Sequence, residues 1–240
     1  MTDKPGNANP EILAVIPARG GSKGLPRKNI RLLNERPLLV YAVEAAFASQ
    51  YQPLVVVSTE DVEIAHVARG AGARVVDRPF ELAQDDTPTL PVVQHAIRVI
   101  EGERRDQVEY VVVLQVTTPL RNCEDIDGAV SKLITTQADS VVSVCQAKPH
   151  PWKLRRIVDD RLVPYFETGP EGVRRQDMPA VFILNGGIYA ATRRVVMERN
   201  SLYGSDCRPY VMPFERSINI DDELDLAFAE FMLRRQETKR

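Results

Sequence analysis

Positively charged side chains and glycines gather in one short segment near the start of the chain. Residues 18–29 read ARGGSKGLPRKN and directly follow the apolar run 12–17, which is typical of a buried strand. Glycines let backbone N–H groups approach an anion closely, and lysine and arginine side chains neutralise its charge. The segment contains the cations Arg19, Lys23, Arg27 and Lys28 and the glycines Gly20, Gly21 and Gly24. This loop therefore predicts a binding site for a polyphosphate.

The spacing of the glycines does not match the two best-known phosphate-binding loops. A Walker A loop needs two glycines separated by four residues and followed by Lys and Ser or Thr, and a dinucleotide fingerprint needs G-x-G-x-x-G with an acidic residue on the next strand. Here the glycines read GGSKG, and the next strand-like segment ends in Ser58 and Thr59 before an acidic residue appears. An exposed basic turn without a ligand is the simpler alternative.

The elements that must position this loop alternate between apolar runs and amphipathic stretches. Strands are predicted at 54–57, 74–76, 110–114 and 140–145, and helices at 37–49, 61–69, 89–101 and 124–135. Such alternation indicates right-handed crossovers and a mostly parallel α/β sheet with helices on both faces. Ligands bind such sheets at the carboxyl ends of the strands, which is where the basic loop would lie.

The pattern changes after Cys145. Residues 146–180 are rich in proline, mix charged with aromatic side chains and show no helical period, so we expect a β-hairpin-rich arm that packs against a partner. Strand patterns at 182–191 and 209–214 and a helical pattern at 222–235 follow. The predicted organisation is one α/β domain over 11–240, with the dimerisation arm 146–180 inserted in it and a flexible tail at 1–10.

The overall composition argues against nucleic-acid and membrane partners. Lys and Arg number 31 against 33 Asp and Glu, so there is no excess of positive charge. The longest apolar runs are far too short to cross a bilayer, and residues 1–11 lack the apolar stretch of a signal peptide. Cys123, Cys145 and Cys207 are far apart and show no C-x-x-C spacing. We therefore expect a soluble cytoplasmic enzyme that binds neither nucleic acid nor membrane.

Five segments spread over the chain match known sequence motifs, and they occur in the same order as those motifs. They are IPARGGSKGLPRKN at 16–29, RPFELA at 78–83, LQVTTPLR at 114–121, NGGIY at 185–189 and SINID at 217–221. Together they resemble the CMP-sialic acid synthetase (acylneuraminate cytidylyltransferase) family, with Val116 and Thr118 in place of its proline and serine. The resemblance implies a Rossmann-like nucleotidyltransferase fold and a homodimer formed through the arm. It also implies CTP and an acidic 2-keto sugar of the nonulosonic (sialic-acid) type as substrates, with Mg²⁺ as the cofactor.

The resemblance further implies roles for individual residues. The residues that would hold the triphosphate and ribose are Arg19, Ser22, Lys23, Lys28 and Asn29. Those that would frame the cytosine are Arg78, Thr89 and the backbone of 83–89. Gln115 would contact the sugar and Tyr189 would line its pocket, with Lys153 and Arg175 facing its carboxylate. Asn185 is expected to bind substrate. The residues expected to be catalytic are Arg19, Lys28, Gln115 and Asp221.

Simpler roles remain open for some of these residues. Arg78 could form only a salt bridge within a loop, and Gln115 could only end a strand. Lys153 and Arg175 could be charges exposed to solvent.

Asn219 and Asp221 are the predicted ligands of Mg²⁺. Residues two apart in a strand point to the same side, so a strand at 217–221 would direct both side chains to one face. The family pattern has aspartate at both positions. Asparagine at 219 supplies an oxygen but no charge, so we expect weaker metal binding or help from Asp222 or Glu223. Alternatively, these acidic residues only begin the last helix, where the helix dipole favours them.

The expected reaction is attack of the sugar's anomeric hydroxyl on the α-phosphorus of CTP, with pyrophosphate as the leaving group. No side chain stands out as a general base. Other acidic sugars, such as legionaminic, pseudaminic or deaminated relatives, and another nucleotide remain open. The alternative that is not an enzyme is a non-catalytic nucleotide-binding homologue, which asparagine at 219 would mark.

Overall fold

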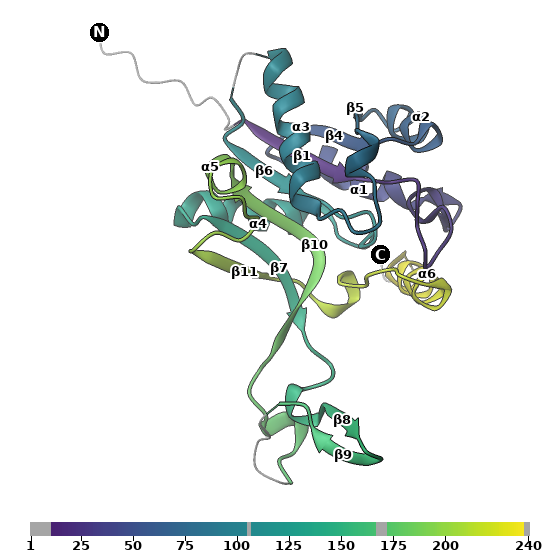
Figure 1. The fold of residues 1–240 in the computed structure, drawn as a ribbon, viewed down its shortest axis with the longest axis vertical. Helices are drawn as coiled ribbons and strands as arrows, with labels where there is room; N and C mark the ends of the chain where they lie inside the picture. Colours follow the sequence, from purple (N-terminus) through teal and green to yellow (C-terminus); the bar gives the residue numbers. More distant parts are fainter. Residues whose placement is uncertain (1–10, 105–106, 167–171, 238–240) are drawn as a thin grey trace.

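A central sheet organises the protein. The computed structural model describes residues 11–104, 107–166 and 172–237, so the predicted tail 1–10 lies outside the described residues. The strands of this sheet are β1 (Ile12–Pro17), β4 (Leu54–Thr59), β5 (Arg74–Asp77), β6 (Tyr110–Val113), β7 (Ser140–Gln146), β10 (Phe182–Thr192) and β11 (Cys207–Val211). They lie in the order β11-β7-β10-β6-β1-β4-β5 (Figure 1). Only β10 runs antiparallel to its neighbours among these strands, so the sheet is mostly parallel, as predicted.

Helices cover both faces of the sheet, which confirms the predicted architecture. They are α1 (Leu38–Phe47), α2 (Val62–Gly70), α3 (Thr89–Arg104), α4 (Cys123–Thr136), α5 (Arg193–Met197) and α6 (Glu223–Glu237). Along β1, Ile12 and Ile16 face a core shared with α1, α2, α4 and α6, whereas Leu13 and Val15 face a core shared with α3 and α5. Alternate side chains of one strand therefore serve both layers. Within the described ranges, every helix falls short of the length and apolar character that a membrane span requires.

Most predicted elements are confirmed to within a few residues, and the misses are short. The antiparallel pair β2 (Leu32–Leu33) and β3 (Arg36–Pro37) and the five-residue helix α5 were not predicted. Elements of this length contain too few residues for a periodic pattern. The predicted strand at 217–221 is wrong, because these residues form neither strand nor helix and lead directly toward α6. A segment becomes a strand only where its backbone hydrogen-bonds to a neighbouring strand, and the local sequence pattern does not reveal that neighbour.

The predicted arm at 146–180 contains a β-hairpin. β8 (Arg155–Val158) pairs antiparallel with β9 (Arg161–Pro164), and the turn residues Asp159 and Asp160 have φ angles of 48° and 58°. Two consecutive positive φ angles are typical of a type I′ hairpin turn. The hairpin projects away from the main sheet beyond the ends of β7 and β10 (Figure 1). Its side chains therefore have few neighbours in the main domain.

Candidate active site

A cavity of about 670 Å³ lies where the loop after β1 meets the segments that follow β5 and β6. Predicted site residues that line it are Arg19, Ser22, Lys23, Lys28, Asn29, Arg78, Thr89, Gln115, Asn185, Tyr189, Asn219 and Asp221. The lining also includes Gln84, Thr87 and Thr117, to which the sequence assigned no side-chain role. Segments that are far apart in the sequence thus converge on one site at the carboxyl edge of the parallel strands.

The loop after β1 is closed at its base by hydrogen bonds. Asn29 Nδ2 donates to the carbonyl oxygen of Arg19 at 2.8 Å, and the Ala18 N–H donates to the carbonyl oxygen of Ser58 at 3.0 Å. A Cβ atom at Gly24 would lie 2.5 Å from the backbone oxygen of Asp221. Glycine at this position therefore allows the loop to approach the segment that precedes α6.

Asp85, which the sequence analysis did not select, lies between two of the loop cations. Its carboxylate oxygens are 2.8 Å from Arg19 Nη1 and 2.6 Å from Lys23 Nζ. The hydrogen bond from Lys23 is the main reason that the pKa of Asp85 lies below its usual value. A phosphate group bound by Arg19 and Lys23 would have to compete with this carboxylate. The only sequence signal was its place in the segment predicted to frame the base.

Arg27 does not line the cavity, which corrects the prediction that all four loop cations neutralise phosphate. Its guanidinium instead pairs with Asp61 at 2.5 Å and with Glu63 at 2.5 Å, at the start of α2. The backbone N–H of Gly20 is also occupied by a carboxylate and not free for a phosphate, because it donates to Glu60 Oε1 at 2.7 Å. Carboxylates near α2 thus attract part of the basic loop.

Lys28 and Asp221 form an ion pair at the cavity. Lys28 Nζ lies 2.9 Å from Asp221 Oδ1, and Asn219 Nδ2 donates to Asp221 Oδ2 at 2.5 Å. The Lys28 side chain is only 16% exposed, so water screens its charge incompletely. Asn219 and Asp221 therefore do lie together, as predicted, although no strand aligns them.

Asp222, rather than Asp221, begins α6. Its Oδ1 accepts hydrogen bonds from the N–H groups of Leu224 and Asp225, both at 2.9 Å. In return, Asp225 Oδ2 accepts the N–H of Asp222 at 3.3 Å and that of Asp221 at 2.9 Å. This reciprocal pattern is a capping box. The helix-starting role that remained open for the acidic run thus applies to Asp222, and the Asp221 carboxylate stays directed at Lys28.

Arg78 is the buried cation of the segment after β5. Its Nε donates to the Ser58 hydroxyl at 3.2 Å, and its Nη2 donates to the Ser58 carbonyl oxygen at 2.5 Å. Its Nη1 lies 3.9 Å from Glu60 Oε2, so a weak salt bridge within the loop is also present. Burial lowers the pKa of Arg78. The side chain combines these structural contacts with a position in the cavity wall beside Thr89.

A bulge in β10 shapes another wall of the cavity. The pairing of β10 with β7 shifts register between Leu184 and Tyr189, and Gly186 has a φ angle of 71°, which favours glycine. The buried Asn185 accepts a hydrogen bond from the Ser143 hydroxyl at 2.6 Å and donates one to the Ser217 hydroxyl at 2.8 Å. The amide of Asn185 is therefore used inside the protein to hold the bulge.

Arg121 connects this bulge to the end of β6, a role that the sequence analysis did not assign. It is 3% exposed, and its Nη1 donates to the carbonyl oxygens of Gln115 at 3.1 Å and Gly187 at 2.8 Å. Burial lowers the pKa of Arg121 to about 10. The backbone of Gln115 is thus tied to the cavity wall and Gln115 lines the cavity, while its contact with a sugar stays a prediction.

A second hollow, of about 300 Å³, adjoins the cavity and shares Thr89, Gln115 and Tyr189 with it. Leu202 and Tyr203 complete its wall, and the Tyr189 and Tyr203 rings meet edge to face with centroids 6.1 Å apart. The site therefore has a polar, cationic part and a more apolar extension.

A family profile described as Cytidylyltransferase matches residues 13–201 of the chain. The chain belongs to the cytidylyltransferase family. The matched range includes the basic loop, Arg78, Gln115 and Tyr189, and it ends before Asp221. The predicted resemblance is thereby confirmed, and so is the assignment of the protein to the nucleotidyltransferase enzymes.

Relatives of this cytidylyltransferase include CMP-N,N'-diacetyllegionaminic acid synthase of Campylobacter jejuni. It is 33% identical over 227 residues, which cover 93% of this chain and 95% of that protein. Post-translational flagellin modification protein B of Campylobacter coli is 30% identical over 225 residues, or 93% of this chain and 95% of that protein. N-acylneuraminate cytidylyltransferase of Escherichia coli O18:K1:H7 is 31% identical over 220 residues, but these cover only 51% of that protein. The chain spans nearly the full length of two relatives and about half of the third.

Solved structures of other cytidylyltransferases share the fold. A CMP:2-keto-3-deoxy-manno-octonic acid synthetase complexed with CTP superposes with a TM-score of 0.70 at 16% identity, covering 94% of this chain and 99% of that chain. A 4-diphosphocytidyl-2C-methyl-D-erythritol synthase from Anaerococcus prevotii gives a TM-score of 0.66 at 13% identity, covering 94% and 97%. At these identities the likeness confirms the predicted nucleotidyltransferase architecture and nothing finer.

The candidate Mg²⁺ ligands in this cytidylyltransferase are the Asp221 carboxylate and the Asn219 amide oxygen. Among residues 11–104, 107–166 and 172–237, no three His, Cys, Asp or Glu side chains gather as a metal-binding group. Proteins commonly hold Mg²⁺ with one or two carboxylates and leave the other positions to water and substrate phosphates. The single carboxylate of Asp221 fits that mode once the ion displaces Lys28 Nζ from Oδ1 and the Asn219 amide nitrogen from Oδ2. Asp221 and Asn219 are thus the residues that would hold the ion together with a nucleotide.

Lys153 lies in the arm and does not line the cavity. Lys153 ends the short helix η3 (Pro151–Lys153) and is exposed, and Arg175 begins η4 (Arg175–Asp177). The side chain of Arg175 lies outside the described residues. Contact of Lys153 with a sugar in this cavity would require the arm of a second chain, and the roles of Lys153 and Arg175 stay predictions.

Proposed function

We propose that this protein transfers the cytidylyl group of CTP to an acidic nonulosonic sugar, giving the CMP-sugar and pyrophosphate. The observation that carries the proposal is one cavity that combines the cationic loop and the Lys28–Asp221 pair with Gln115 and Tyr189. The names of the relatives support the substrate class, because they include synthases of CMP-activated legionaminic acid and N-acylneuraminate cytidylyltransferases.

The chain's own residues supply positioning and charge for this transfer. The oxygen of the sugar's anomeric hydroxyl forms a bond to the α-phosphorus of CTP. The bond between the α-phosphorus and the oxygen that bridges to the β-phosphate breaks, pyrophosphate leaves, and the hydroxyl proton is released. Arg19, Lys23 and Lys28 place positive charge where negative charge builds up on the departing pyrophosphate. Mg²⁺, when bound, would neutralise further charge on the phosphate oxygens. Gln115 and Tyr189 would orient the sugar, and the adjoining hollow has room for one of its substituents.

The reaction is tested by measuring pyrophosphate release with four nucleoside triphosphates and a panel of 2-keto sugar acids. We expect release only when CTP and a nonulosonic acid are both present. Release with another nucleotide would identify a different nucleotidyltransferase. Binding of CTP without release for any sugar would instead indicate a non-catalytic nucleotide-binding homologue.

CTP with Mg²⁺ should raise the melting temperature more than UTP, ATP or GTP. The segment from Arg78 to Thr89 is proposed to frame the cytosine and to exclude the larger purines. At a concentration of 100 Kd a ligand stabilises its protein by about 2.7 kcal/mol, which for a chain of this length is a shift of roughly 5–10 °C. Thermal-shift titrations provide the measurement. Stronger stabilisation by GTP than by CTP would contradict the choice of nucleotide.

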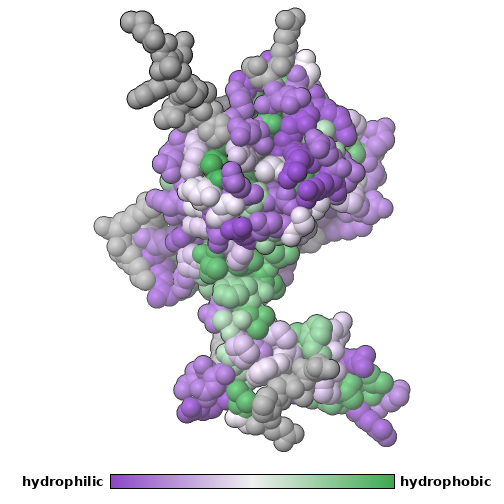
Figure 2. Space-filling view, turned by 90° about the vertical axis from the view of Figure 1, so that its left-hand side faces the viewer, coloured by the Kyte–Doolittle hydropathy of each residue, from purple (hydrophilic) through white to green (hydrophobic). Residues whose placement is uncertain are grey.

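We further propose a homodimer formed through the arm. Figure 2 shows hydrophobic surface gathered where the arm leaves the main domain. Phe182, Ile183 and Leu184 at the start of β10 are about half exposed, and Ile157 and Leu162 in the hairpin are more than 70% exposed. Exposed apolar surface of this extent indicates an interface. A second copy would cover it and would bring Lys153 and Arg175 toward a neighbouring cavity.

Sedimentation velocity should find a particle of twice the 26.9 kDa chain mass. Replacing Ile183 with Glu should shift the equilibrium toward single chains, because it places a charge in the apolar surface. Mixing impaired Lys28→Ala and Arg175→Ala chains should give more activity than the average of the two separate variants if the arm serves the neighbouring site. A single-chain particle at working concentration would refute the dimer.

A further inference from the structure

Two acidic residues at the junction of β4 and α2 hold the basic loop at two points. Glu60 Oε1 accepts the backbone N–H of Gly20 at 2.7 Å, near the start of the loop. Asp61 receives both ends of the Arg27 guanidinium, near the end of the loop, with Nη1 to Oδ2 at 2.5 Å and Nη2 to Oδ1 at 3.0 Å. Three of the loop residues that line the cavity, Ser22, Lys23 and Gly24, lie between these two points, and Lys28 directly follows the second.

The backbone at Arg27 turns its side chain away from that of Lys28. Arg27 has a φ angle of 58°, in the left-handed region that non-glycine residues rarely adopt, and Lys28 directly begins the short helix η1 (Lys28–Ile30). Lys28 lines the cavity and Arg27 does not. An unfavourable backbone conformation of this kind persists only where surrounding contacts maintain it. The bidentate pair with Asp61 is such a contact.

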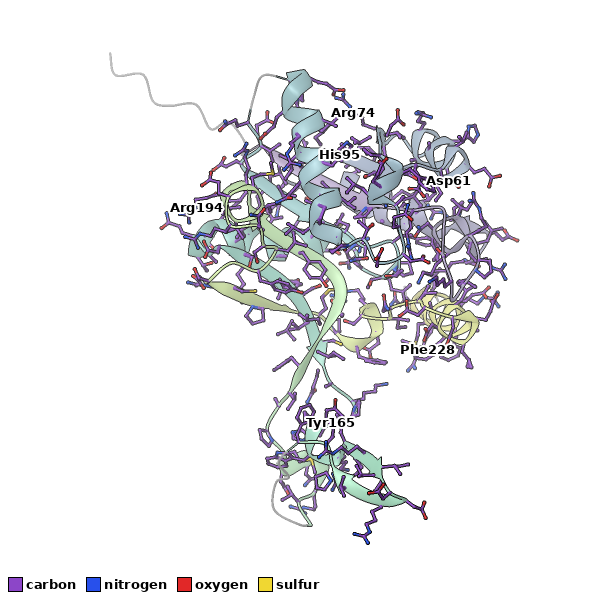
Figure 3. The ribbon with its side chains drawn as sticks, in the orientation of Figure 1. Asp61, Arg74, His95, Tyr165, Arg194 and Phe228 are labelled. Carbon is purple, nitrogen blue, oxygen red and sulfur yellow. The ribbon has the colours of Figure 1, made fainter. Side chains whose placement is uncertain are left out.

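The surroundings of Asp61 fit a fixed position for its carboxylate. A Cβ atom at Gly20 would lie 2.5 Å from Asp61 Oδ2, so the loop packs against this oxygen without an intervening side chain. Asp61 Oδ1 also accepts the N–H of Ile64 at 2.9 Å and thereby caps α2. The hydrogen bond from Arg27 holds the pKa of Asp61 below its usual value. Figure 3 shows Asp61 on the side of the molecule that carries α2, far from Tyr165 in the arm.

We propose that Asp61 is a positioning residue for the nucleotide phosphates, acting through Arg27. By holding Arg27, it keeps the loop in the shape that presents Lys23 and Lys28 to a triphosphate. Arg27 is then a structural charge and not a phosphate ligand. This inference rests on the proposed function, because it assumes that the loop receives CTP.

The role of Asp61 as the cap of α2 is separable from its pair with Arg27. Asparagine caps helices about as well as aspartate, so Asp61→Asn keeps the cap but loses the bidentate ion pair. Arg27→Gln removes the same pair from the other side without touching the cap. Glu63→Gln is the matched control, because Glu63 also contacts Arg27 but is 74% exposed and therefore weakly coupled.

Hydrogen–deuterium exchange of the ligand-free protein tests the positioning role without any activity assay. In Asp61→Asn and Arg27→Gln we expect faster exchange of the amides in residues 18–29, with unchanged exchange in α2. Glu63→Gln should resemble the wild type. Faster exchange confined to Ile64 and the rest of α2 would show that Asp61 only caps the helix, and would overturn the proposal.

Calorimetric titration with CTP and Mg²⁺ supplies the second readout. The Kd for CTP should rise about tenfold in Asp61→Asn and in Arg27→Gln, as expected when one charge-assisted contact is lost, and KM for CTP should rise more than kcat falls. The affinity for cytidine, which has no phosphate, should stay at the wild-type value. Unchanged CTP affinity in both variants would overturn the proposal. A wild-type protein that fails to bind CTP would overturn the proposed function instead, while the exchange result would still show whether Asp61 orders the loop.

Discussion

Replacing Lys28 with alanine should lower kcat/KM for CTP by between about tenfold and about a hundredfold. Among the three loop cations that line the cavity, Lys28 is the most shielded, at 16% exposure, and its ammonium group faces Asp221 at 2.9 Å. Its charge is therefore worth more to a bound phosphate than that of an exposed lysine. Steady-state kinetics with CTP varied at saturating sugar, alongside melting curves, provide the measurement.

Arg31→Ala is the matched control for this variant. Arg31 directly follows η1 and also pairs with an acidic residue near the start of α6, Glu223 at 2.9 Å, but it is 47% exposed and does not line the cavity. We expect its kinetics to stay within about twofold of the wild type, since exposed ion pairs contribute little. Wild-type kinetics in Lys28→Ala would contradict phosphate binding and would indicate that the loop is only an exposed basic turn.

Replacing Asp221 with asparagine should remove most activity at ordinary Mg²⁺ concentrations, by about a hundredfold or more. Asp221 supplies the carboxylate of the proposed metal site, and with Asn219 beside it the variant would present two neutral amides. Asn219→Asp should do the reverse and lower the Mg²⁺ concentration needed for half-maximal rate. The measurement is rate against Mg²⁺ concentration for the wild type and both variants.

Asp222→Ala distinguishes the metal site from the helix start. Asp222 caps α6, so its loss should lower the free energy of unfolding by about 1 kcal/mol. The Mg²⁺ dependence of the folded enzyme should remain that of the wild type. Asp221→Asn should instead alter the Mg²⁺ dependence of the rate. Its free energy of unfolding should change little, because Asp221 is 69% exposed. A normal Mg²⁺ profile in Asp221→Asn would exclude this residue from the metal site.

The features that depend on neighbours along the chain could be predicted from the sequence. The apolar run 12–17 and the glycines and cations after it identified both the first strand and the loop that lines the cavity. Periodicities of 2 and 3.6 residues located most strands and helices, and their alternation required a mostly parallel sheet. The carboxyl ends of parallel strands meet at one edge, which is why Gln115 and the loop could be placed together before the fold was known.

The direction in which each charge points was decided by the tertiary structure alone. Arg27 and Lys28 are adjacent cations that the sequence cannot distinguish, yet Arg27 pairs with Asp61, 34 positions away, and Lys28 with Asp221, 193 positions away. Asp85 likewise meets Arg19 across 66 positions.

The same holds for the roles of Asp221 and Asp222 and for the course of the chain at 217–221. One carboxylate caps a helix and its neighbour faces the cavity, although both stand in the same acidic run. A local pattern determines whether a segment can form a strand or helix. An ion pair forms only between groups a few ångströms apart, because the attraction weakens with distance and water screens it. Which groups reach that distance depends on how distant segments pack, and that information is present only in the folded chain.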